Sequence, residues 1–297
     1  MPASWQPYVT ALFVGMGTGG VYALVAMGYN LVFSSTGVFN LAQGDLVSVG
    51  GFLAFALVTS SHVNVLLAVC VAIAAVGALG LIQELITVDP YLRRKGDGFG
   101  WLIATLGASV AIENGLQLIW GSEPHPVPPL VSHATFYILG APVAASYVLV
   151  FVIAVAIAVG IDVWTARTMI GQAWRATAED REAAQARGIN VRAVGIAAFV
   201  LAAMLSGLAG FLVAPITEAQ YNAGAIMSLQ GFVAIAIGGF GAQRGALVGS
   251  LLLGIAEAEA SLIWSPGYQS TTALVLLMLV LVVRPSGLFG RVDPRVA

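Results

Sequence analysis

The sequence predicts an all-α polytopic membrane protein with about eight to ten transmembrane helices, some of them short or broken. Of its 297 residues, 59% are hydrophobic and only 9% are charged, whereas soluble domains carry about 25% charged residues. Because so few charged residues could not cover a core of this size with a surface that water solvates, we expect lipid to surround the protein. Residues 1–297 then form one transmembrane domain, and the net charge of −2 gives no support for nucleic acid as a partner.

A membrane-spanning helix needs roughly 20 apolar residues. Nine segments meet or approach that length, at about residues 8–33, 44–60, 65–87, 100–120, 143–165, 193–213, 226–240, 246–263 and 269–285. Two regions, residues 34–60 and 226–240, are short and interrupted by glycine. Each can be a span or a re-entrant segment.

Basic residues predict the orientation, because lysine and arginine stay preferentially in cytoplasmic loops. They gather in four places that can share one side of the membrane: YLRRKGD with Arg93, Arg94 and Lys95, the segment from Arg167 to Arg192, Arg244, and the tail with Arg284, Arg291 and Arg295. The proline-rich stretch GSEPHPVPPLVSH, residues 121–133, has no lysine or arginine and fits the outside. Nine spans would place the N-terminus outside and the C-terminus inside.

The longest polar segment, residues 171–192, contains GQAWRATAEDREAAQARGINVR. It predicts a helix of about ten residues in which Thr177 caps the start, Asp180 completes a capping box and Gly188 provides a left-handed exit. Such a helix can be a solvated connector. Its alanines would equally permit close docking of a partner.

Within that segment, Glu182, Ala183, Ala184 and Gly188 spell EAAxxxG, which resembles the coupling-loop motif of permease subunits in bacterial ABC importers. Other stretches narrow the resemblance to the branched-chain amino-acid permease family. They are SSTGVFNLAQGDLVSVGGFLA, AAMLSGLAGFL, GGFGAQRGALVGSLLLGIAEA and LVLVVRPSGLFG, in the family's order along the whole chain. The form FNLAQGD is more similar to the H-type member of the usual permease pair than to the M-type member.

The resemblance implies a permease in the bacterial cytoplasmic (inner) membrane that imports branched-chain amino acids or a similar small solute. Its implied partners are a second homologous permease subunit (M-type), two cytoplasmic ATP-binding subunits and an extracytoplasmic solute-binding protein. ATP and Mg would bind to the partner subunits. The residues implied to couple to the ATPase are Thr177, Asp180, Glu182, Ala183, Ala184 and Gly188. The family also includes permeases for urea, short amides and small carboxylates, which leaves the solute open.

No enzyme is expected in this chain. It contains no GxxxxGK[ST] motif, Lys95 is its sole lysine, and no HExxH or GxSxG arrangement is present. We therefore predict no catalytic residue, no metal site and no cofactor of its own. The alternative function is a self-sufficient, ion-coupled secondary transporter in which a buried acid such as Glu113 or Glu257 carries a proton.

A possible internal repeat points to the solute path. NLAQGDLVSVGGF and MSLQGFVAIAIGGF share a glutamine–glycine pair followed by GGF, and paired glycine-broken segments often mark a path at the membrane midplane. Chance similarity in a glycine-rich chain, and simple capping by Asn40, are competing explanations. The candidates for the path are Asn40, Gln43, Asp45, Gln230 and Glu113, and those for hinges or helix breaks are Gly44, Gly50, Gly51, Gly238, Gly239 and Gly241.

Overall fold

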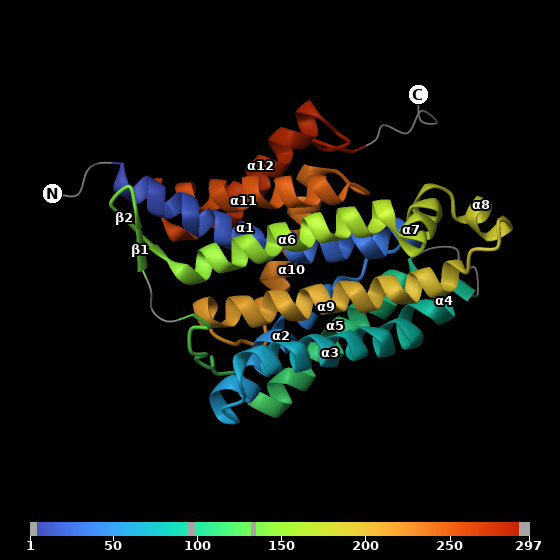
Figure 1. Ribbon diagram of the computed structural model, residues 1–297, viewed down its shortest axis with the longest axis horizontal. Coiled ribbons are helices and arrows are strands. Elements are labelled where there is room, and N and C mark those ends of the chain that lie inside the picture. Colours follow the sequence, from blue (N-terminus) through green and yellow to red (C-terminus); the bar gives the residue numbers. More distant parts are fainter. Residues whose placement is uncertain (1–4, 94–98, 132–134, 291–297) are drawn as a thin grey trace.

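The computed structural model describes residues 5–93, 99–131 and 135–290 (Figure 1). Several residues used above to predict the orientation lie outside the described residues, namely Arg94, Lys95, His133, Arg291 and Arg295.

Each of the nine predicted spans is helical. The α-helices are α1 (Gln6–Thr36), α2 (Asp45–Ala54), α3 (Val65–Gln83), α4 (Asp89–Arg93), α5 (Gly100–Trp120), α6 (Ala145–Arg167), α7 (Met169–Glu179), α8 (Arg181–Ala186), α9 (Val191–Thr217), α10 (Ala223–Gly238), α11 (Gln243–Ile263) and α12 (Gln269–Val283). Short 3-10 turns, η1 (Leu41–Gln43) and η4 (Pro266–Tyr268), precede α2 and α12. Two π-helical turns, η2 (Phe55–Ser60) and η3 (Glu84–Val88), continue α2 and α3.

Eight helical stretches of the described chain are long and apolar enough to cross a membrane, and α10, with 16 residues, is shorter. The predicted all-α architecture of eight to ten helices, some short, is therefore confirmed. A two-stranded antiparallel hairpin that was not predicted, β1 (Thr135–Ile138) and β2 (Ala141–Ala144), precedes α6.

Local side-chain caps define where several helices begin. Asn64, Thr168, Asp180 and Asn190 each accept a hydrogen bond from a backbone N–H in the first turn of α3, α7, α8 and α9 respectively. At the other end of α1, Gly37 adopts φ 71° and allows the chain to turn sharply toward η1.

Several arginines gather at one end of the helix bundle. α4, α7 and α8 lie at one end and the β1–β2 hairpin lies at the other (Figure 1). Arg181 donates to the carbonyl of Thr36, Arg192 pairs with Asp89, and Arg244 pairs with Asp162, so these basic residues lie at the α8 end. By the positive-inside rule the α8 end is cytoplasmic. α1 then begins outside and α12 ends inside, which is the orientation that nine spans would give.

The stretch from η1 through η2 is a complete span. Its start lies at the cytoplasmic end, where Asn40 bonds with Gln83. Its other end lies at the outside, where Phe55 packs against His125. The region is therefore not re-entrant.

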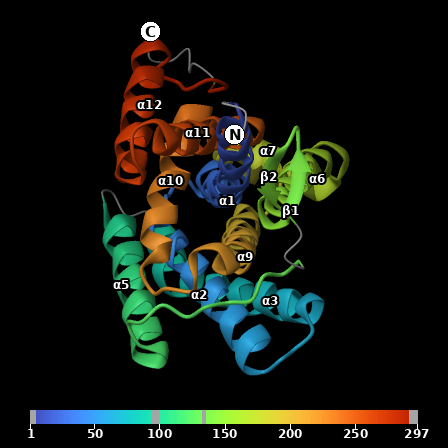
Figure 2. The ribbon, with the colours of Figure 1, turned by 90° about the vertical axis from the view of Figure 1, so that its left-hand side faces the viewer.

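α10 crosses the neighbouring helices at a steep angle and bridges two groups of them (Figures 1 and 2). Its start packs against Gly44 of α2, its middle packs against Val25 of α1, and its end packs against Gly245 of α11. The two glycine-broken segments run in opposite directions, because Gly44 lies against Gly224 whereas Gly51, further along α2, lies near Ala219. Glycines at both ends of α10 allow it to approach two different helices closely, which tilts it across the bundle.

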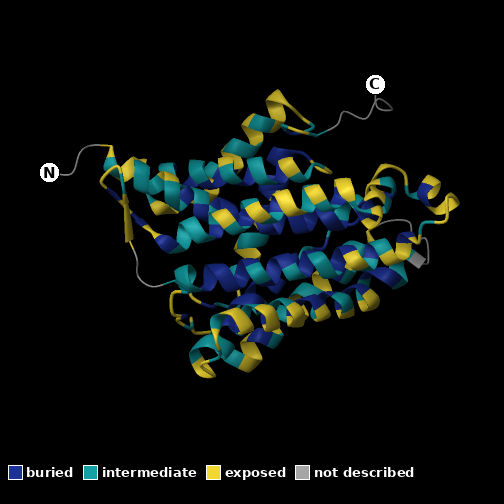
Figure 3. Cartoon of the chain, viewed as in Figure 1, coloured by how far each residue is buried: buried dark blue, intermediate teal, exposed yellow. Residues whose placement is uncertain are grey.

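The core lies along α1, α2 and α9, whereas α5 and α12 expose most of their side chains (Figure 3). Lipid tails are as apolar as leucine, so close packing rather than hydrophobic exclusion holds helices together in a membrane. Glycines provide that packing. Gly15 and Gly19 of α1 lie against Gly254 and Ser250 of α11, and Gly210 of α9 lies against the backbone of Val47.

We predict that Gly210→Ala destabilises the protein, because the added methyl group would overlap the carbonyl oxygen of Val47. Overpacking of this kind costs about 1–3 kcal/mol or more. Gly107→Ala on α5 is the control, since its methyl group meets no atom of the described chain within 4 Å. Thermal unfolding in detergent should show a lower midpoint for the first variant alone. Equal midpoints for both variants would contradict the packing account.

Candidate functional site

A cluster of buried amides marks the cytoplasmic entry to α2. Asn40 accepts a hydrogen bond from the backbone N–H of Ala42 at 3.2 Å and so caps η1. This is the capping role that competed with a place in the solute path. Its side-chain oxygen also accepts from Gln83 Nε2 of α3 at 2.6 Å. Asn40 therefore ties the turn before α2 to the end of α3.

Gln43 fixes the same turn to α9. Its side chain is fully buried, and its Nε2 donates to the carbonyl of Ala202 at 2.9 Å and to Ser206 Oγ at 2.7 Å. It also lies directly against Gly28 of α1. Each of these bonds links segments far apart in the sequence, so the amides hold α1, α2, α3 and α9 in register.

Two of the candidate acids lie on neighbouring helices. Asp45 is the first residue of α2 and is buried, and Glu113 lies on α5, which packs against α2. The position of Asp45 at a helix start favours a carboxylate, because the helix dipole is positive there. Gln230 is placed separately on α10, where it is buried and its Oε1 has no hydrogen-bond partner among the described residues.

The candidate hinge glycines fall into two groups. Gly44, Gly50 and Gly238 leave no room for a Cβ atom beside the backbones of Gly224, Gly207 and Gly245, and Gly51 has looser neighbours in α9. Gly239 and Gly241 instead adopt φ of 103° and 83°, which favours glycine, at the turn between α10 and α11. In this turn the N–H of Gly241 donates to Asn30 Oδ1 at 2.7 Å.

An aromatic cluster near the cytoplasmic end was not predicted. Phe39 stacks on Phe33 with ring centroids 4.4 Å apart and meets the edges of Phe232 and Phe240 at 5.6 and 5.5 Å. Trp101 of α5 completes the cluster at 6.5 Å from Phe39. The signal was present in the sequence, since Phe39 precedes NLAQGD and Phe240 ends the second GGF, but spacing alone does not show that the two rings meet.

The cytoplasmic segment contains two helices instead of one. Thr177 does not cap a helix, contrary to the prediction. It lies inside α7, is buried, and donates to the carbonyl of Ala173 at 2.9 Å. Asp180 is the cap, because its carboxylate accepts from the N–H of Ala183 at 2.9 Å and starts the six-residue helix α8. Gly188 ends the segment with φ 85°, as predicted.

α8 projects from the cytoplasmic end of the bundle (Figure 1). Ala184 is buried and anchors the helix, whereas Glu182, Ala183 and Gly188 are exposed. The exposed face of α8 consists mostly of small side chains and carries one acidic side chain. Another chain could therefore approach the backbone of α8 closely.

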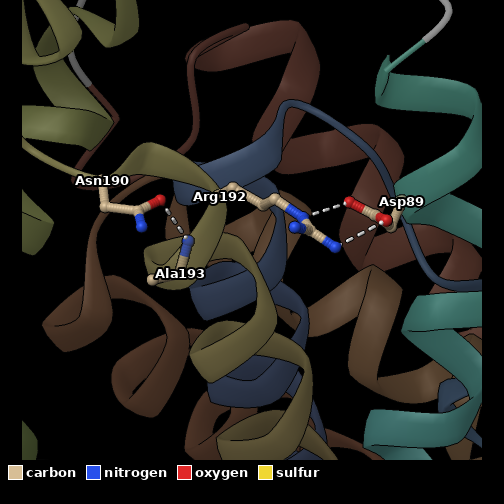
Figure 4. Close-up of polar contacts among 4 residues, drawn as sticks. All are labelled: Asp89, Asn190, Arg192 and Ala193. Carbon is tan, nitrogen blue, oxygen red and sulfur yellow. Dashed lines mark hydrogen bonds and ion pairs between the residues drawn. The ribbon is translucent and has the colours of Figure 1, made fainter.

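Two arginines connect this segment to the membrane helices. Arg181 Nη1 donates to the carbonyl of Thr36, at the end of α1, over 3.3 Å. After the turn, Arg192 makes a two-pronged ion pair with Asp89 at 2.7 and 3.0 Å, beside the Asn190 cap of α9 (Figure 4). Displacement of α8 would therefore act on α1, and displacement of the start of α9 would act on the segment that follows α3.

Comparison with known proteins gives the family that the sequence motifs resemble, over nearly the whole chain. The family described as "Branched-chain amino acid transport system / permease component" matches residues 11–283. A high-affinity branched-chain amino acid transport system permease protein, BraD of Pseudomonas aeruginosa, is 30% identical over 301 residues, with 96% of each chain covered. The corresponding permease protein LivH of Escherichia coli K12 is 28% identical, also over 96% of each chain.

A solved structure supports the fold. PsaBC from Streptococcus pneumoniae in complex with Fab matches with a TM-score of 0.50, covering 95% of this chain and 93% of that one, at 16% sequence identity. At that identity the match concerns the arrangement of helices alone. The family match, by contrast, extends from α1 to α12, including residues 171–192 and the amide cluster. The chain therefore belongs to the permease-component family of branched-chain amino acid transport systems.

Proposed function

We propose that this chain is one membrane-spanning subunit of an ATP-driven importer for branched-chain amino acids or a similar small solute. α8 carries this proposal. It is a short, capped helix on the cytoplasmic side with an exposed small-residue face, and Arg181 joins it to the central helix α1. A solvated connector would need neither the buried anchor at Ala184 nor the bond to α1.

The energy would come from partner chains. In the proposed complex, two cytoplasmic ATP-binding subunits bind ATP and Mg and dock on α8 of this chain and of a second, homologous permease. Thr177 and Ala184 serve as buried anchors. Asp180, Glu182, Ala183 and Gly188 shape and present the docking face. An extracytoplasmic binding protein would deliver the solute to the end that carries the β1–β2 hairpin, in the inner membrane of a bacterium.

The aromatic cluster is the proposed cytoplasmic gate. Phe39 contacts rings from α1, α5 and the α10 region, so movement of any of these elements changes the cluster. Asp45 and Glu113 lie on the neighbouring helices α2 and α5, where their carboxylates can pair with the ammonium end of an amino acid. Gln43, by contrast, is packed against α9 and α1 and would keep the turn before α2 fixed to these helices beside the gate.

We expect Glu182→Arg to reduce both retention of the ATPase subunits during purification and solute-stimulated ATP hydrolysis, by roughly tenfold or more. The substitution reverses the charge of the acidic residue on the exposed face of α8. Glu123→Arg makes the same change at an exposed site near the outside end and should retain the ATPase subunits. Uptake of solute by this chain without ATPase subunits would refute the importer and favour a secondary transporter.

Phe39→Ala should open the cytoplasmic gate. Aromatic pairs contribute about 0.5–1.5 kcal/mol each, so loss of the ring contacts of Phe39 predicts a leak of radiolabelled leucine roughly tenfold above that of the wild type. The leak is measured in proteoliposomes containing the assembled complex without ATP. Phe136→Ala on the exposed hairpin is the control. An unchanged leak in Phe39→Ala would show that the cluster is not the gate.

A further inference from the structure

A second candidate site lies in the outer half of the bundle, away from the amide and aromatic clusters. It is a cavity of about 570 Å³ between α1 and α11, bordered by β2 and the start of α12. Its walls are mainly apolar, with Pro7, Ala11, Val14, Pro142, Ala258 and Leu262 among them. A space of this volume can hold a small organic molecule.

Glu257 of α11 lies at this cavity and is only 3% exposed. Side chains on a helix lean toward its N-terminus. Because α1 and α11 run in opposite directions, Tyr22 and Glu257 lean toward each other, and the Tyr22 hydroxyl donates to Glu257 Oε2 at 2.9 Å. The second carboxylate oxygen, Oε1, is buried without a hydrogen-bond partner among the described residues.

This oxygen points to a ligand. An ionisable group inside a membrane protein is costly unless it is paired, and such groups commonly mark binding sites. Glu257 is the single charged residue among those that line the cavity within the described chain. The other lining polar groups are uncharged: the hydroxyls of Thr10 and Thr18 donate to the carbonyls of Pro142 and Val14, and Gln6, Ser261 and Gln269 also line the cavity. Glu257 Oε1 therefore lacks a hydrogen-bond donor, and a cationic donor suits a carboxylate best.

The residues that line the cavity limit what else the ligand can be. A metal ion prefers several oxygen or nitrogen ligands, and the described residues contain no group of three or more acidic, histidine or cysteine side chains that could hold one. The apolar walls fit a short hydrocarbon chain. A zwitterionic amino acid fits poorly, because no basic side chain of the described residues lines the cavity to pair with its carboxylate.

We propose that the cavity between α1 and α11 is a binding site for an aliphatic ammonium group, held by a charge-assisted hydrogen bond to Glu257 Oε1. The site is separate from the proposed solute path and does not depend on it. The ammonium group can belong to a free alkylamine or to the ethanolamine headgroup of a lipid, and both sources present the same chemistry to Glu257.

The test is calorimetric titration of the purified full-length chain with hexylamine at pH 7. We expect saturable binding, and weaker or no binding of 1-hexanol, hexanoate and norleucine, which lack the cation or add an unpaired carboxylate. Glu257→Gln should raise the apparent Kd for hexylamine at least about tenfold, because the substituted amide keeps its shape and loses its charge. Glu259→Gln removes the same charge two residues away, outside the cavity lining, and should bind as the wild type does.

A second variant guards against an effect on folding. Ala258→Phe fills the cavity and leaves Glu257 in place, and it too should abolish binding while the chain keeps its thermal midpoint. Nanodiscs of phosphatidylcholine with or without phosphatidylethanolamine then separate the two sources. Competition by phosphatidylethanolamine identifies the lipid headgroup, and its absence identifies a free amine. Failure of hexylamine to saturate, or equal affinity in Glu257→Gln, would overturn the proposal, whatever the result of the importer assays.

Discussion

Close contact between helix backbones holds this helix bundle together. In lipid, apolar side chains gain little by leaving their surroundings, so helices associate through tight packing and buried hydrogen bonds. Glycine provides the approach wherever the core helices meet: α1 with α11, α2 with α9, and α10 with both α2 and α11. The many glycines of the chain thus act mainly as contact surfaces, and the positions of its polar groups follow from them.

That packing joins the cytoplasmic surface to the interior. α1 lies at the centre of the bundle, where it contacts α6, α9, α10 and α11. Its cytoplasmic end accepts the hydrogen bond from Arg181 of α8, and its last turns carry Phe33 of the aromatic cluster and Tyr29, whose ring lies 6.5 Å from that of Phe39. The amides of Asn40 and Gln43 hold the adjoining turn to α3 and α9. A push on α8 therefore reaches the proposed gate through one continuous set of contacts.

Much of the fold follows from the sequence because lipid sets the length and composition of a span. Apolar length predicted each transmembrane segment, and arginines expected on one side of the membrane, Arg181, Arg192 and Arg244, lie at one end of the bundle. The Thr177 cap was wrong because two capping residues, Thr177 and Asp180, lie three residues apart, and local pattern alone could not choose between them. The tilt of α10 and the meeting of Phe39 with Phe240 arise from contacts between distant segments, which one-dimensional spacing does not encode.

Whether α8 acts on the gate through α1 can be measured at position 240. In a Cys70→Ser background, the Phe240→Cys variant is labelled in the assembled complex with and without a non-hydrolysable ATP analogue. We expect the nucleotide to change the labelling rate several-fold, and we expect Arg181→Gln to abolish this change while ATP analogue binding persists. A nucleotide-dependent change that survives Arg181→Gln would contradict transmission from α8 through the end of α1.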